Sequence, residues 1–248
     1  MAFISDDDNL FLAKLDDAVF LCQKRAKPYF LSFLSERKQV LAEQHLKLHG
    51  FDNFVFFGGY DGAERKVLGL FPYESEVFPV KALEFCFRKT DKLTHRDFLG
   101  ALMSLGIERE TVGDILVEDG RCVVFLKSEI SDYVASQIFK IGNTGVKVRT
   151  ANTDTLPKGR GFEEKDYTVS SLRLDAVVAV VTGRSREKTK NCILSGNVSR
   201  NFVCCQNVSQ IMSEKDVFTI RGKGKFVLNG VLGETKKHRI RISIIHFR

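Results

Sequence analysis

The sequence contains only 4 prolines in 248 residues, and it has no low-complexity tract and no internal repeat. Its longest uninterrupted aliphatic run covers residues 176–181, which is far too short to cross a bilayer. The first ten residues are acidic, whereas a secretory signal needs positive charge ahead of a longer apolar run. These absences argue against a secreted or membrane-spanning protein, and they predict a cytoplasmic chain with no membrane partner.

No pair among the six cysteines has C-x-x-C spacing. Most of them stand in apolar stretches, which favours reduced core thiols over the alternatives of a zinc site or a redox pair. His45 and His49 lie four residues apart, but Leu46 stands where a zinc protease needs glutamate. We also find no nucleophile with a paired base and no synthetase signature. The sequence therefore predicts no metal, no cofactor and no catalytic residue.

Positive charge is concentrated in the last third of the chain. The whole sequence has 38 Lys+Arg and 31 Asp+Glu, a net charge of +7. Residues 165–248 hold 16 of the basic and 6 of the acidic residues, a net charge of +10, so the preceding 164 residues carry −3. A basic module attached to a near-neutral body is typical of a nucleic-acid-binding protein. A solvated charged face is the alternative interpretation.

The chain divides into three sections and a linker, and the predicted fold class is α+β. Residues 1–50 read as two helices, with Pro28 at the start of the second and Gly50 at its end. In residues 51–154, short strands alternate with helices at 95–106 and 128–142, which predicts an α+β sandwich with a mostly antiparallel sheet. Residues 155–167 form a predicted linker. Residues 168–248 begin with two short helices and continue as strands.

The two short helices carry the first group of basic residues. Ser171 is the expected cap of the first helix, which ends at Gly183, and Ser185 is the expected cap of the second. On the second helix, Arg186 and Lys190 lie four apart and share a face. Exposed N–H groups where this helix begins can bind the same phosphate as Arg184. Asp175, in the first turn of the first helix, can orient an arginine.

The final strand predicts a second basic row. Arg239 and Arg241 alternate with Ile240, Ile242 and Ile244, so one side of the strand is cationic and the other packs inward. Further lysines lie near turns of the same sheet, at positions 223, 225, 236 and 237.

Several motifs occur here in a fixed order. They are R-L-D at residues 173–175, S-R at 185–186, I-x-x-G-x-V-x-x-N at 193–201 and D-x-x-x-I-R-G-K-G-K at 216–225. This series resembles the S4 RNA-binding domain. S4 domains usually have V-N-G where this chain has Arg200-Asn201-Phe202, so the turn geometry there is open. The resemblance and the charge pattern together predict these RNA-binding residues: Arg173, Arg184, Ser185, Arg186, Lys190, Asn201, Arg221, Lys223, Lys225, Arg239 and Arg241.

Two stretches extend the resemblance over nearly the whole chain. The segments FFGGYDGAERKVLGLFP and THRDFLGALMSLGIERETVGDIL, followed by the C-terminal S4-like region, are similar to the YlmH family of bacterial proteins. Membership implies a cytoplasmic, ribosome-associated protein encoded near cell-division genes in Gram-positive bacteria. It also implies structured RNA as the partner, namely large-subunit ribosomal RNA and tRNA, and a role on large subunits blocked by an unfinished nascent chain. The oligomeric state is left open.

Two other functions remain open. One is a protein adaptor of the cell-division or ribosome-rescue machinery. The other is an RNA-modifying enzyme, because pseudouridine synthases use an aspartate in an R-L-D context. Here, however, Asp175 precedes an apolar helix face, no T-S-G follows, and the S4-like region comes last.

The first 160 residues are expected to select the context in which RNA is bound. Arg65, Lys66, His95 and Arg96 are the predicted exposed contacts. The segment GGYDGAER lacks the lysine and hydroxyl of a P-loop and reads better as a hairpin turn. Residues 96–116 could form a helix-turn-helix, but the acidic second segment favours a packed helix and loop.

Overall fold

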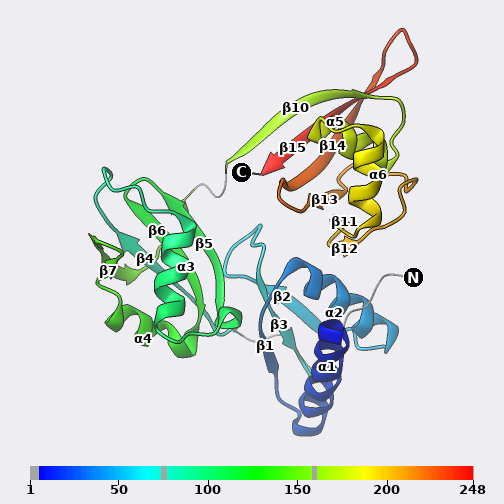
Figure 1. Cartoon of the computed structure of the whole chain (residues 1–248). Helices are drawn as coiled ribbons and strands as arrows, with labels where there is room; N and C mark the ends of the chain where they lie inside the picture. Colours follow the sequence, from blue (N-terminus) through cyan, green and yellow to red (C-terminus); the bar gives the residue numbers. More distant parts are fainter. Residues whose placement is uncertain (1–5, 74–76, 158–160, 248) are drawn as a thin grey trace. The chain divides into compact units, whose positions relative to one another are not determined.

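The computed structural model describes residues 6–73, 77–157 and 161–247. It separates into two compact units, which we call the N-terminal unit (Ser5–Gly159) and the C-terminal unit (Arg160–Arg248) (Figure 1). Within the described ranges, no helix is both long enough and apolar enough to span a membrane.

The N-terminal unit begins with a three-stranded sheet covered by two helices. Its elements are α1 (Asp6–Arg25), β1 (Tyr29–Leu34), α2 (Glu36–Leu48), β2 (Phe54–Phe57) and β3 (Lys66–Leu70). The strand order is β1-β3-β2, and both pairs are antiparallel. Phe11 and Leu15 of α1 and Leu46 of α2 share a buried cluster with Leu68 and Leu70 of β3. Hydrophobic burial therefore holds both helices against this sheet.

The prediction of a second helix starting at Pro28 is wrong, because Tyr29–Leu34 is a strand. Three of its six residues are aromatic, which suits a strand, and β1 gains backbone pairing with β3. The helix starts only at Glu36, where the Ser35 side chain accepts a hydrogen bond from the Lys38 N–H at 3.4 Å. The paired strands β1 and β3 lie on opposite sides of residue 50 in the sequence, so the predicted boundary at that residue divides one sheet.

The rest of this unit has a β-α-β-β-α-β order. It consists of β4 (Val80–Cys86), α3 (His95–Ser104), β5 (Val112–Glu118), β6 (Arg121–Lys127), α4 (Ser128–Gln137) and β9 (Lys147–Thr150). A small hairpin, β7 (Lys140–Ile141) with β8 (Thr144–Gly145), precedes β9. The sheet order β5-β6-β4-β9, with antiparallel neighbours, is the ferredoxin-like arrangement. The predicted antiparallel α+β architecture is therefore confirmed.

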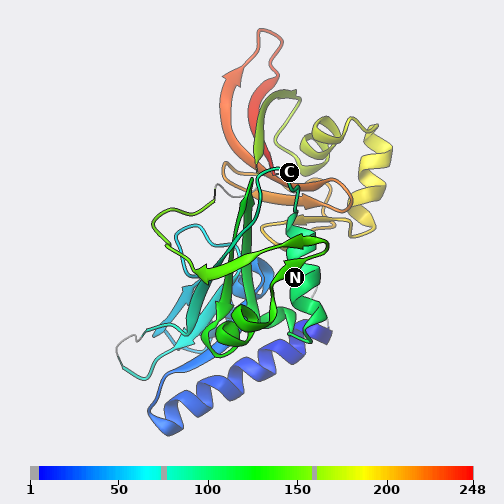
Figure 2. The same ribbon diagram turned by 90° about the vertical axis from the view of Figure 1, so that its left-hand side faces the viewer.

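The two faces of this four-stranded sheet pack against different partners. Phe98 and Leu102 of α3 and Val134 of α4 share a buried cluster with residues of β4, β5 and β6; α3 lies beside the strands in both views (Figures 1 and 2). The opposite face contributes Val123 and Phe125 of β6 to a second cluster. This second cluster also includes residues of the β1-β3-β2 sheet, so the two sheets pack together.

The segment after α3 does not form a second helix. A 3-10 turn, η1 (Arg109–Thr111), leads directly into β5. The predicted helix and loop at this point is therefore a helix, a turn and a buried strand.

The C-terminal unit packs two short helices on a six-stranded antiparallel sheet. Its elements are β10 (Phe162–Val169), α5 (Leu174–Thr182), α6 (Arg186–Leu194), β11 (Val198–Arg200), β12 (Val203–Cys204), β13 (Val217–Ile220), β14 (Gly224–Glu234) and β15 (Ile240–Phe247). The strand order is β10-β15-β14-β13-β11-β12. Val177 of α5 and Ile193 of α6 are buried with Phe218, Leu228 and Ile242 of the sheet.

Part of the predicted linker belongs to this sheet. All eight residues of β10 pair with β15, from Phe162 opposite Phe247 to Val169 opposite Ile240. The mixed charges of this segment suggested a linker, but an edge strand has one exposed side on which charge is common. Residues 158–160 of the predicted linker lie outside the described residues.

The turn that lacks the usual glycine still reverses the chain between β11 and β12. Asn201 and Phe202 both have positive φ angles, +47° and +65°. Two consecutive left-handed residues are what a tight hairpin between twisted strands requires. The departure from V-N-G therefore leaves the hairpin intact, with Phe202 in a backbone region that glycine adopts more easily.

Candidate nucleic-acid interface

An arginine–carboxylate pair lies where α5 begins. Arg173 is the N-cap residue, and its Nε and Nη2 donate to the two carboxylate oxygens of Asp175 at 3.1 and 2.9 Å. Asp175 also accepts the Ala176 N–H at 2.9 Å. The predicted cap at Ser171 is wrong, because the residue at the N-cap position is Arg173. The hydrogen bonds from Arg173 lower the pKa of Asp175, and Arg186 adds a smaller effect of the same sign. Asp175 therefore stays ionised and holds Arg173 in place, which confirms that it orients an arginine.

The start of α6 is also built as its sequence predicts. Gly183 ends α5 with φ +64°, and the Ser185 hydroxyl accepts the Lys188 N–H at 3.4 Å. Arg184 is half-buried, and its Nη1 lies 3.3 Å from the Sγ of Cys192 on α6. The guanidinium of Arg184 is therefore anchored beside α6 and does not extend freely into solvent.

Two adjoining hollows bring four of the predicted arginines together. Arg173 and Arg186 line the smaller hollow, of about 300 Å³, with Asp175 and two serines. Arg184, Arg186 and Arg239 line the other, of about 330 Å³, with residues of β10 and α5. Arg239 reaches this place because its Nη2 donates to the Thr168 carbonyl of β10 at 3.1 Å. Because Arg186 lines both hollows, it is the centre of what we call the arginine surface: Arg173, Arg184, Arg186 and Arg239.

The other predicted residues line neither hollow. Lys190 is exposed on α6, and Arg241 pairs with Asp166 at 3.3 Å. Arg221 and Lys223 are exposed at the turn between β13 and β14. Lys225 follows them on β14, with its Nζ 5.0 Å from the centre of the Phe247 ring. The structure therefore divides the predicted RNA-binding residues between the arginine surface and separate exposed positions.

Asn201 is held by bonds within the protein. Its side chain donates to the Asp216 carboxylate at 2.7 Å and accepts the Val217 N–H at 2.9 Å. Asp216 is buried and also accepts from Arg200 Nε at 2.6 Å and from the Ser213 N–H at 2.7 Å. This network fixes the β11–β12 hairpin to the start of β13. A structural role is thus visible for Asn201, while RNA binding by this residue stays a prediction.

A basic hairpin tip adjoins Arg239 in the sequence. Lys236, Lys237 and His238 are exposed between β14 and β15, where the Thr235 N–H donates to the Arg239 carbonyl at 2.8 Å. This hairpin extends beyond the other elements of the C-terminal unit (Figures 1 and 2). The sequence places Lys236 and Lys237 near a turn but does not predict that the hairpin projects, because its projection depends on strand register.

In the N-terminal unit, Arg65 is not an exposed contact. Its Nε donates to the Val112 carbonyl at 3.0 Å and its Nη2 to the Phe33 carbonyl at 2.9 Å. The GGYDGAER segment connects β2 and β3, as the hairpin interpretation predicts, and buried Asp114 organises it. Asp114 accepts the Tyr60 hydroxyl at 2.9 Å and the backbone N–H of Glu64 and Arg65 at 2.7 and 3.0 Å. Arg65 therefore serves the fold.

Of the other three predicted contacts in this unit, Arg96 is exposed, whereas Lys66 and His95 are half-buried.

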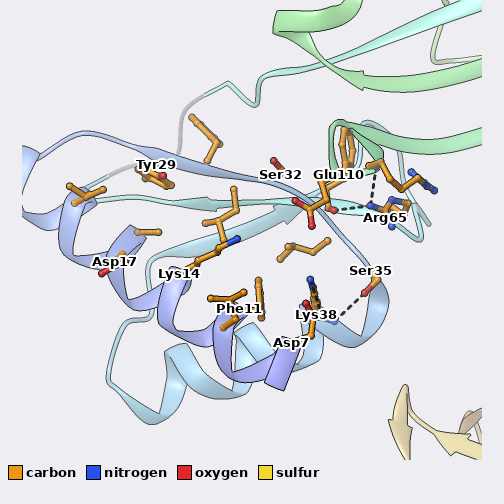
Figure 3. A pocket seen from close by; sticks show the side chains of 18 residues that line it. Asp7, Phe11, Lys14, Asp17, Tyr29, Ser32, Ser35, Lys38, Arg65 and Glu110 are labelled. Atoms are coloured by element: carbon orange, nitrogen blue, oxygen red, sulfur yellow. Dashed lines mark hydrogen bonds and ion pairs between the residues drawn. The ribbon is translucent and has the colours of Figure 1, made fainter. Parts of the chain in front are cut away.

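A groove of about 680 Å³ runs between α1 and β1, with Tyr29 towards one end and Arg65 towards the other (Figure 3). Arg109 also lines it, and burial followed by repulsion from Arg65 lowers the pKa of Arg109 to about 10. Lys14, Lys38, Asp7, Asp17 and Glu110 line the same groove. Its charge is therefore mixed.

Comparisons with known proteins give one consistent family. A profile described as "Putative RNA-binding domain in YlmH" matches residues 74–155. The curated "Ribosome-associated protein quality control protein P2" of Bacillus subtilis is 32% identical over 245 residues, covering 96% of this chain and 94% of that protein. A solved structure, "Cell division protein ylmH from Streptococcus pneumoniae", matches with a TM-score of 0.53 and 23% identity, covering 61% of this chain and 95% of that one. The last likeness concerns the fold alone. Because the 32% identity to the Bacillus subtilis protein extends over nearly the full length of both proteins, the chain belongs to the YlmH family.

Proposed function

We propose that this chain is a non-catalytic, cytoplasmic RNA-binding protein that associates with ribosomes. In this proposal the C-terminal unit is an S4 domain that docks on structured ribosomal RNA. The role extends to large subunits blocked by an unfinished nascent chain, with large-subunit RNA and tRNA as the contacted molecules. The name of the Bacillus subtilis relative supports a place in ribosome-associated quality control.

The observation that carries this proposal is the arginine surface. Arg186 lines both of its hollows, and Arg184 and Arg239 approach it from the α5–α6 connection and from the position just before β15. Guanidinium groups bind phosphates through paired, charge-assisted hydrogen bonds, and several of them in one concave place fit a folded RNA backbone. The ion pair between Arg173 and Asp175 holds the Arg173 side of this concave surface in a fixed position.

Catalysis is not required by the geometry around Asp175. Its two carboxylate oxygens accept hydrogen bonds from Arg173, and one also accepts the Ala176 N–H. A carboxylate used in this way positions a neighbouring cation, and its lowered pKa makes it a weak general base. Asp175 is therefore assigned a positioning role in RNA binding.

Replacing Arg186 with alanine is expected to weaken the binding of a structured RNA hairpin by about 1–3 kcal/mol, the range for one charge-assisted contact. The exposed Arg186 side chain can be removed without unfolding the unit, which circular dichroism can verify. Lys165→Ala is the matched control, because Lys165 lies on β10 outside both hollows and pairs with Glu163. Filter binding or fluorescence anisotropy measures both variants. Unchanged affinity in a folded Arg186→Ala chain would refute the assignment.

A further inference from the structure

The four-stranded sheet of the N-terminal unit has the topology of a common RNA-binding module, but its usual binding face is covered. In β-α-β-β-α-β modules that bind single-stranded RNA, bases stack on aromatic side chains of the sheet face opposite the helices. Here Val123 and Phe125 of β6 are 1% and 0% exposed on that face. They share a core with Phe33 and Val67 of the other sheet, and Tyr60 stacks on Phe125 at 4.8 Å. RNA cannot reach these positions without unfolding the unit.

At the remaining end of that sheet face, arginine and glutamate side chains neutralise one another. Glu84 of β4 pairs with Arg149 of β9 at 2.9 Å, and Arg121 of β6 lies 3.7 Å from Glu84 and 2.8 Å from Glu118. Cations neutralised by carboxylates in this way offer little attraction to phosphate. The uncovered part of the sheet therefore lacks the electrostatic features of an RNA site.

A third surface, between α3 and β7, has the missing features. Arg96 and Lys140 line a hollow of about 550 Å³, and among the described residues neither forms an ion pair. Asp97 lines it too, but its carboxylate accepts hydrogen bonds from the Thr94 N–H and hydroxyl at 2.8 and 2.7 Å. Gly100 and Ser104 follow Arg96 at four-residue spacing and line the same hollow. A Cβ at Gly100 would meet nothing within 4 Å, so this side of α3 is open to solvent. The small side chains let a sugar–phosphate backbone approach the helix between two cations.

An exposed aromatic ring lies next to this hollow in the chain. Phe139, which directly precedes Lys140, is 70% exposed, an unusual position for so large an apolar side chain. Its backbone is fixed, because the Val146 N–H donates to the Phe139 carbonyl at 2.9 Å. Exposed aromatic rings close to cations are the side chains on which unpaired bases stack.

We infer that the α3–β7 surface is a second RNA site, which binds a single-stranded segment. Arg96 and Lys140 hold its phosphates, and Phe139 stacks on an unpaired base. The inference rests on the proposed function, because it assigns a place for RNA to a unit whose family profile is described as RNA-binding. It gives the N-terminal unit a contact with exposed nucleotides, while the arginine surface binds folded RNA.

The test uses the full chain carrying Arg184→Glu and Arg186→Glu, which reverses the charge of two of the four residues of the arginine surface. The probe is a fluorescent 12-nucleotide oligouridine. This background is expected to keep measurable binding to oligouridine. Adding Lys140→Glu or Gly100→Glu should weaken that binding about tenfold, and adding Phe139→Ala about fivefold or more. Ultraviolet crosslinking followed by mass spectrometry should place the bound uridine on the peptide that contains Phe139.

A control variant separates a specific site from general charge. Lys147→Glu changes another exposed lysine, on β9, and should have less than a twofold effect.

The inference is overturned if the background variant does not bind oligouridine, or if Lys147→Glu weakens binding as much as Lys140→Glu. Neither result touches the arginine surface, which is tested separately by the loss of hairpin RNA binding in the same background.

Discussion

Between roughly 50 and 200 mM salt, the affinity of the intact chain for a structured RNA is expected to fall by about three orders of magnitude. This estimate corresponds to the neutralisation of about six phosphates, each of which releases condensed counterions on binding. The C-terminal unit has the cations for this, because residues 165–248 carry a net charge of +10. The arginine surface and the tip lysines Lys236 and Lys237 place several of them on exposed positions.

The slope of this salt dependence also tests the individual contacts. Each phosphate contact that is removed should reduce the slope by about 0.9, so Arg184→Glu with Arg186→Glu should flatten it by about two. Lys165→Ala should leave the slope unchanged. Titrations at four or more salt concentrations measure it directly. An intact chain whose affinity hardly changes with salt would show that its ligand is not primarily a polyanion.

Replacing Asp216 with alanine is expected to destabilise the C-terminal unit by about 3–5 kcal/mol. Asp216 is 6% exposed and accepts hydrogen bonds from Arg200, Asn201 and the Ser213 N–H. Its removal leaves the half-buried Arg200 without its carboxylate and frees the β11–β12 hairpin. Amide hydrogen exchange of β11 and β13 in the full chain should accelerate strongly. Asp166→Ala is the control, because the exposed Asp166–Arg241 pair should contribute less than about 1 kcal/mol.

Asp216 also predicts how the stability of this unit depends on pH. Burial alone would raise its pKa, but hydrogen bonds from Arg200, Ser213 and Asn201 outweigh burial and hold the pKa below the usual value. A lowered folded-state pKa stabilises the fold at pH values above the unfolded-state pKa, which is about 4. This stabilisation is lost as the pH falls through the folded-state value. Asp216→Asn should therefore remove part of the acid sensitivity seen in exchange of β13, and an unchanged acid response would contradict this role.

The features predicted well from the sequence depend on residues close together in the chain. Ser185 caps α6, Gly183 ends α5 and Asp175 orients Arg173, two residues away. Each of these contacts spans three residues or fewer, so residue type and spacing determine it. The same holds for the alternation of Arg241 with buried Ile242 and Ile244 along β15.

The structural features that the sequence does not predict depend on contacts with residues distant in the sequence. Strand β5 contains Gly113 and Asp114, two residue types that strands disfavour, so its sequence resembled a loop. Both are explained by contacts with other elements. A Cβ at Gly113 would lie 2.6 Å from the ring of Phe33. The carboxylate of Asp114 accepts hydrogen bonds from the backbone N–H groups of Glu64 and Arg65, in the loop before β3. Arg65 looked exposed for the same reason, because the carbonyl groups that accept its hydrogen bonds come from β1 and β5.

Cosedimentation with purified large ribosomal subunits through a sucrose gradient tests the central claim most directly. The claim is that the arginine surface docks this chain on ribosomal RNA. The wild-type chain and the Lys165→Ala control should travel with the subunits, and the chain carrying Arg184→Glu and Arg186→Glu should remain at the top of the gradient. If the charge-reversed chain is folded and still sediments with the subunits as the wild type does, the arginine surface is not the docking site.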